Sequence, residues 1–112
     1  MKKTITGLYK APGKPIETLT VENSLEALQQ LVGGYIETFT VSTDCVLLCD
    51  EEGKIKGKPA NFSFAGQLFV GPVFICGAWN GDFTDLRISA EAQNTLAWEI
   101  RRNDWFGVAY EC

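Results

Sequence analysis

Three lysines alternate with other residues in the segment that follows an acidic turn. If this segment is extended, side chains two positions apart point to the same side, and the ammonium groups of Lys54, Lys56 and Lys58 line up. Such a row can neutralise a phosphate-bearing ligand. Lysines on an edge strand also discourage pairing between sheets, and two neighbouring glutamates can compete for the charge. The row therefore predicts either a ligand site or a protected edge.

Other side chains supply the remaining chemistry of a nucleotide site. Asn61 would hydrogen-bond a base or a sugar, and Tyr35 or Trp79 would stack on a ring. The sequence contains no spaced glycine pair followed by Lys-Ser or Lys-Thr, so it has no phosphate-loop motif. The expected ligand is nucleotide-like, and its site is inferred from side-chain chemistry alone.

A second candidate surface lies on the helix expected over residues 89–103. Its apolar residues share one side, whereas Trp98 falls on the opposite, polar side with Arg101 and Arg102. Tryptophan and arginine are enriched among the residues that anchor interfaces. We therefore expect an interaction surface of Trp98, Arg101, Arg102 and Trp105. Alternatively, one arginine stacks on the indole, or the segment that carries Trp105 folds back over it.

The residue types that most often carry catalysis are scarce in this chain. It has no histidine, which is the commonest general base and metal ligand, so a Ser-His-Asp triad is impossible. Cys45 and Cys49 lie in one expected strand, roughly 13 to 14 Å apart at ~3.4 Å per residue, too far for a shared metal ion or a disulfide. All four cysteines are expected to be free thiols. We expect no catalytic residue, no metal, no cofactor and no enzymatic activity.

Length and charge further limit the classes of fold and function that the chain can belong to. The chain has 112 residues, of which 46% are hydrophobic, enough for one compact domain spanning residues 1–112. Its net charge of -4 argues against binding duplex nucleic acid through a basic face. No apolar run has membrane-spanning length, and the first residues lack the apolar stretch of a signal peptide. A cytoplasmic location without a membrane partner is expected.

Turn signals and apolar periodicity predict the elements at the start of the chain. Residues 4–9 and 16–21 are β-type runs separated by prolines and a glycine, which predicts a hairpin. A helix follows, with Asn23 as its N-cap and a glycine pair at residues 33–34 as its end. The expected apolar stripe of this helix consists of Leu25, Leu28, Leu31 and Val32.

The remaining elements are mostly strands. Residues 35–41 alternate, residues 45–49 are apolar on both faces and so lie centrally, and residues 82–88 include a short strand. Residues 68–76 predict another continuous strand, in which Gly71-Pro72 marks a bulge or an exposed edge. Ser89 caps the second helix. The resulting class is α+β, with a single, mainly antiparallel sheet of about five to six strands and two helices.

Three stretches carry a family resemblance: Gly34-Tyr35-Ile36-Glu37, residues 50–61 (DEEGKIKGKPAN) and residues 69–77 (FVGPVFICG). In this order they resemble the small proteins of domain of unknown function family 3846, over roughly residues 4–86. Members occur in bacteriophages, mobile elements and Gram-positive bacteria, so the resemblance implies a phage or mobile-element accessory protein in the bacterial cytoplasm. The family supplies no catalytic residues that apply here.

Two functions follow as hypotheses. The first is a non-catalytic binding protein that counters host defence by sequestering a nucleotide-like signal or by blocking a host protein. The second is a protein-protein interaction module or homodimeric accessory protein without a defence role, which binds through the surface around Trp98.

Overall fold

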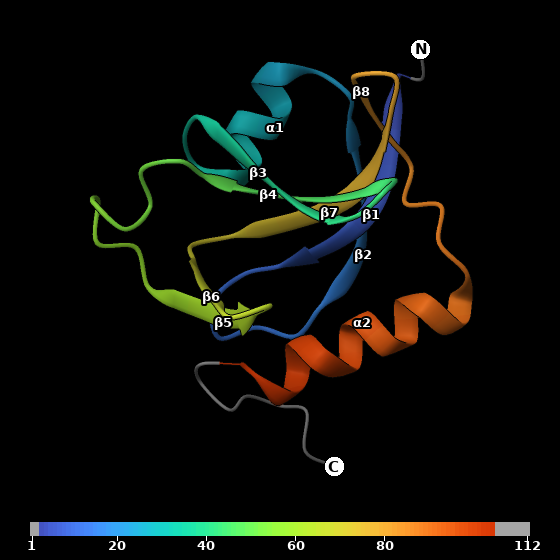
Figure 1. The fold of residues 1–112 in the computed structure, drawn as a ribbon. Helices are drawn as coiled ribbons and strands as arrows, with labels where there is room; N and C mark the ends of the chain where they lie inside the picture. The colour runs from blue at the N-terminus through green and yellow to red at the C-terminus, as the bar shows by residue number, and fades with distance from the viewer. Residues whose placement is uncertain (1–2, 105–112) are drawn as a thin grey trace.

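A six-stranded antiparallel sheet occupies the centre of the computed structural model, which describes residues 3–104 (Figure 1). Its strand order is β2-β1-β7-β4-β3, and β8 pairs with the end of β7. The strands are β1 (Thr4–Lys10), β2 (Glu17–Glu22), β3 (Ile36–Ser42), β4 (Cys45–Asp50), β7 (Val73–Trp79) and β8 (Asp82–Thr84). The apolar strand β4 lies inside the sheet, as its sequence predicts, because both of its faces are covered.

Helix α1 (Leu25–Val32) covers one face of this sheet (Figure 1). Leu28 and Val32 are buried there, in a cluster that includes Phe74 of β7. The predicted stripe is wrong at Leu25, whose side chain is 65% exposed. Periodicity places this residue on the apolar side, but it lies in the first turn, at the end of the helix farthest from the buried Val32.

The N-cap of α1 is Ser24, which corrects the assignment of Asn23. The Ser24 hydroxyl accepts a hydrogen bond from the Ala27 amide at 3.1 Å. Asn23 instead donates from its side chain to the Phe83 carbonyl at 3.2 Å, which ties the start of the helix to β8. At the other end the glycine stop is confirmed, because Gly33 has a φ of 82°, the left-handed conformation that glycine adopts at little cost.

The opposite face of the sheet is covered by two elements, a small hairpin and the second helix (Figure 1). The hairpin consists of β5 (Ala60–Phe64) and β6 (Gln67–Val70). The helix is α2 (Ala90–Arg102), and its predicted N-cap, Ser89, is confirmed. Leu96 and Ile100 of α2 are buried against Phe62 and the inner face of the sheet. Each face of the sheet therefore has its own apolar cluster.

The prediction of one strand over residues 68–76 is wrong. The segment forms β6 and β7, which belong to different sheets, and Gly71-Pro72 is the corner between them. Gly71 is buried with a φ of 72°, and its amide donates to the Pro59 carbonyl at 2.8 Å. The chain passes from one layer to the other here, so the pair marks neither a bulge nor an exposed edge.

The predicted class is confirmed: the fold is α+β with two helices and a mainly antiparallel sheet. The small β5–β6 sheet is an addition that the sequence did not predict. Among the helices of residues 3–104, none has the length and apolar character needed to cross a membrane.

Candidate functional site

The predicted lysine row is replaced by a cluster around Asp50. This carboxylate is buried at the end of β4, and its Oδ2 lies 2.7 Å from Lys58 Nζ and 2.9 Å from Lys56 Nζ. Its Oδ1 accepts from the Glu52 amide at 2.9 Å. Burial by itself raises the pKa of Asp50, but the hydrogen bonds from Lys58, Lys56 and the Glu52 amide outweigh it and lower the pKa to about 2. The carboxylate is therefore ionised and paired at neutral pH.

The same two lysines also close the end of α1. Lys58 Nζ donates to the Val32 carbonyl at 2.9 Å and to the Gly33 carbonyl at 3.0 Å, and Lys56 Nζ donates to the Gly33 carbonyl at 3.3 Å. Cations are favourable at a helix C-terminus because the last carbonyls lack partners within the helix. Lys56 and Lys58 thus hold the 51–59 segment against α1 and β4.

The expected extended conformation of this segment is wrong, because residues 51–57 form consecutive turns. Lys56 and Lys58 form the ion pairs with Asp50, whereas Lys54 lines a small pocket with Glu37, Asp50 and Glu51. The structure does not place the three ammonium groups in one row.

The remaining predicted ligand residues lie in three different places. Asn61 is fully buried, and its side-chain amide donates to the Lys10 carbonyl at 2.9 Å and the Gly71 carbonyl at 2.8 Å. Tyr35 and Trp79 are exposed, but Tyr35 adjoins the Asp50 end of β4, whereas Trp79 lies beyond its Cys45 end. The two aromatic rings therefore do not belong to one site.

A buried ion pair escaped the sequence analysis. Lys10 Nζ lies 2.8 Å from Asp104 Oδ2, and both side chains are almost completely buried. The pair fastens the end of α2 to β1, and a bridge between Phe62 and Asp104 adds a connection to β5. Neither residue carries a local signal for this contact, because the two lie at opposite ends of the chain.

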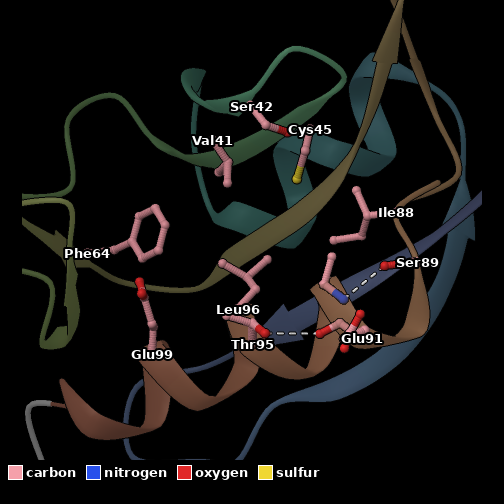
Figure 2. Close-up of a pocket in the computed structure, with 11 residues that line it drawn as sticks. Val41, Ser42, Cys45, Phe64, Ile88, Ser89, Glu91, Thr95, Leu96 and Glu99 are labelled. Atoms are coloured by element: carbon pink, nitrogen blue, oxygen red, sulfur yellow. Dashed lines mark hydrogen bonds between the residues drawn. The ribbon is translucent and has the colours of Figure 1, made fainter.

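A groove lies between α2 and the edge of the sheet formed by β3 and β4 (Figure 2). Its cavity volume is about 480 Å³. Figure 2 shows Leu96 rising from α2, the sulfur of Cys45 pointing into the groove, and Phe64 facing Glu99 across one end. The lining residues are Val41, Ser42, Cys45, Phe64, Ile88, Ser89, Glu91, Ala92, Thr95, Leu96 and Glu99.

The groove combines an apolar floor with an acidic rim. Cys45 and Leu96 are buried, and Val41, Phe64 and Ile88 are partly exposed, so together they give an apolar surface. Of the described residues in the lining, Glu91 and Glu99 are the charged ones, and both are exposed on α2. The volume lies within the range of roughly 300 to 1,000 Å³ typical of small-molecule sites, and the composition suits an apolar group that carries positive charge nearby.

Its surroundings keep the thiol in this groove protonated at neutral pH. Burial, with a further contribution from the Asp44 charge, raises the pKa of Cys45 to about 11. Burial also raises the pKa of Cys49 to about 11 and that of Cys76 to about 12. Cys45, Cys49 and Cys76 are free and buried, and they therefore behave as small apolar side chains.

The outer side of α2 carries the predicted interaction surface. Trp98 is 53% exposed, and the guanidinium carbon of Arg102 lies 4.8 Å from the centre of its ring. The expected stacking of an arginine on the indole is thus confirmed, while half of the side chain stays open to solvent. Arg101 is also exposed. Trp105 lies outside the described residues. The structure shows that Trp98, Arg101 and Arg102 are exposed, and an interaction through them stays a prediction.

No group of three or more potential metal ligands comes together within residues 3–104. The arrangement in this part of the chain offers an apolar groove and a tryptophan-arginine surface on the same helix, and both are suited to holding another molecule.

Comparisons with curated proteins and with solved structures give no match. A family model does match residues 5–96, and it describes a domain of unknown function, DUF3846. This span includes one apolar cluster completely, the other except Ile100, the Asp50 cluster and the groove lining except Glu99. The chain belongs to the DUF3846 family.

Proposed function

We propose that this protein is a non-catalytic binding module that holds a partner polypeptide in the groove between α2 and the β3–β4 edge. The occupant is an apolar side chain with cationic neighbours. The observation that carries the proposal is a groove of about 480 Å³, whose apolar floor lies beside the exposed carboxylates of Glu91 and Glu99.

The chemistry of the groove favours a polypeptide of this kind. Burying an aliphatic or aromatic side chain on the floor contributes about 1.5 to 3 kcal/mol. Arginine or lysine next to it would reach Glu91 and Glu99, which lie two helical turns apart along α2. These exposed pairs add little affinity, but they select partners by charge and speed the encounter.

The nucleotide-binding alternative has less support. Lys56 and Lys58 already pair with the carboxylate of Asp50, and Asn61 is enclosed in the protein. A phosphate at this cluster would compete with a buried carboxylate for the same ammonium groups. Sequestration of a nucleotide-like signal thus stays a prediction, which calorimetry with a panel of nucleotides addresses directly.

The setting implied by the family resemblance suggests what the partner is. In a phage or mobile element, a binding module of this type would block a host protein and so counter host defence. An accessory role without any connection to defence would use the same groove, and the proposed binding chemistry is common to both.

The test uses two short peptides as probes, each with a central Leu-Leu pair. One peptide has arginines on both sides of the pair, and the other has glutamates. Fluorescence anisotropy should detect saturable binding of the arginine peptide, weakened by salt, and at least tenfold weaker binding of the glutamate peptide. Equal binding of both peptides, or of neither, contradicts the proposal.

A matched pair of variants locates the site. Ala92→Phe fills the groove, whereas Ala90→Phe adds the same ring to an exposed position of α2 outside the lining. We expect binding to be lost in the first variant and kept in the second, with the circular dichroism of both unchanged. Loss in both variants would place the peptide elsewhere on the helix.

A further inference from the structure

The exposed face of α2 has a self-complementary order of residues. At about 100° per residue, Glu91, Thr95, Trp98 and Arg102 fall within a stripe roughly 60° wide. All four side chains are exposed, while Leu96 and Ile100 on the other side of the helix are buried. In Figure 1, α2 lies along the outside of the molecule.

The four positions are arranged symmetrically about the centre of the stripe. Residues 91 and 102 lie equally far from the centre of the stripe, and so do residues 95 and 98. When two identical helices pack antiparallel about a two-fold axis through this centre, position 91 of one faces position 102 of the other, and 95 faces 98. Each residue of the stripe then meets its complement.

We infer that two copies of this chain pair through α2 in this antiparallel, two-fold arrangement. Each Glu91 carboxylate then meets the Arg102 guanidinium of the other copy, so the dimer contains two identical ion pairs. At about 1.5 Å per residue the two pairs lie roughly 16 Å apart along the helix, one at each end of the contact. The charges exclude the parallel arrangement, which would place like charges opposite each other.

The centre of the contact is apolar. Each Trp98 packs on Thr95 of the second copy, and the stack of Arg102 on the indole holds the ring in a fixed orientation before association. Half-exposed tryptophan beside arginine is the composition of an interface anchor. Because Thr95 also lines the groove, Trp98 of the second copy comes to lie at the groove mouth and extends its apolar wall.

Dimerisation needs no third molecule, so it is tested without the peptide; because Glu91 also lines the groove, the second copy and a cationic peptide compete for its carboxylate. Dimerisation is measured with the purified chain alone, by sedimentation equilibrium from about 1 µM to about 1 mM. The expected particle at the upper end has twice the 12.4 kDa mass of one chain. A single-chain mass throughout this range overturns the inference, and it leaves the peptide binding test unaffected.

Charge reversal tests the geometry. Arg102→Glu alone and Glu91→Arg alone each place like charges opposite each other, twice per dimer, and should weaken association at least about tenfold. The double variant E91R/R102E exchanges the partners and should restore association. Arg87→Glu is the control, because it makes the same charge change at an exposed residue that precedes α2 and lies outside the stripe.

Trp98→Ala should weaken association at least about thirtyfold, as expected for an interface anchor. Thermal unfolding of each variant shows whether the fold is kept. An R87E effect as large as that of R102E, or a folded double variant that stays monomeric, contradicts the antiparallel pairing.

Discussion

The ammonium group of Lys58 lies 2.7 Å from the carboxylate of Asp50, and it also donates to the carbonyls of Val32 and Gly33 at the end of α1. One side chain therefore neutralises a buried charge and caps a helix. It does so from a segment of turns that has few apolar anchors of its own, so the lysine positions that segment in the fold.

Replacing Lys58 with methionine should destabilise the protein by about 2 to 4 kcal/mol, because it leaves the buried carboxylate of Asp50 with one fewer partner. Urea unfolding measures the change. Lys54→Met is the matched control, since Lys54 is exposed and the ion pairs of Asp50 are made by Lys56 and Lys58, and it should change stability by less than about 0.5 kcal/mol. Equal effects of the two substitutions would refute the assigned role.

Stability should fall at acidic pH through Asp50. Its pKa is lowered to about 2 in the folded state, so folding favours the ionised form. The contribution is complete above the unfolded pKa, near 4, and is lost as the pH falls towards 2, with a total of at most about 2 kcal/mol.

Unfolding free energies of the wild type and of Asp50→Asn, measured across this pH range, test this expectation. The difference between the two proteins should shrink as the pH is lowered. The substitution Glu51→Gln, at an exposed carboxyl next in the chain, is the control for the loss of one negative charge in this turn. A constant difference between wild type and D50N would show that Asp50 contributes no pH dependence.

The buried pair of Lys10 and Asp104 should behave differently when one partner or both are removed. Lys10→Met removes the ammonium group that faces the buried Asp104 carboxylate and should cost about 3 to 5 kcal/mol. Adding Asp104→Leu removes that charge too, and it should recover a substantial part of the loss. Chemical denaturation of the wild type, both single variants and the double variant gives the unfolding free energies of a double-mutant cycle. A double variant less stable than K10M would contradict this account.

Trp98→Ala should leave folding nearly intact, because half of the residue is exposed and, among residues 3–104, its ring contact is the stack with Arg102. We expect the free energy of unfolding to fall by less than about 1 kcal/mol. The free energy of association with the second copy of the chain should weaken by at least about 2 kcal/mol. Thermal unfolding and binding are measured on the same preparation. A parallel loss of both would make the indole a structural residue.

Local patterns were sufficient for most elements of the fold. The hairpin of β1 and β2, the glycine stop at Gly33 and the Ser89 cap each depend on residues close in sequence, and all three are confirmed. The corner at Gly71 is different, because a continuous apolar run does not show that the chain changes layers.

The candidate site was predictable only in part. Helical periodicity alone placed Trp98 and Arg102 on the solvent side of α2, and the structure agrees. The lysines were assigned by their spacing, but their partners are a carboxylate and helix carbonyls brought together by the fold. The groove likewise joins residues from β3, β4 and α2, which no local pattern connects.

The central claim is that the groove between α2 and the β3–β4 edge is the binding site. The most direct measurement is the titration of ¹⁵N-labelled protein with the arginine-flanked Leu-Leu peptide, followed by amide chemical shifts. The account predicts saturable shifts centred on Val41, Phe64 and Leu96, with residues 54–58 unchanged. Shifts confined to residues 54–58, or no shifts at peptide concentrations up to about 1 mM, would contradict it.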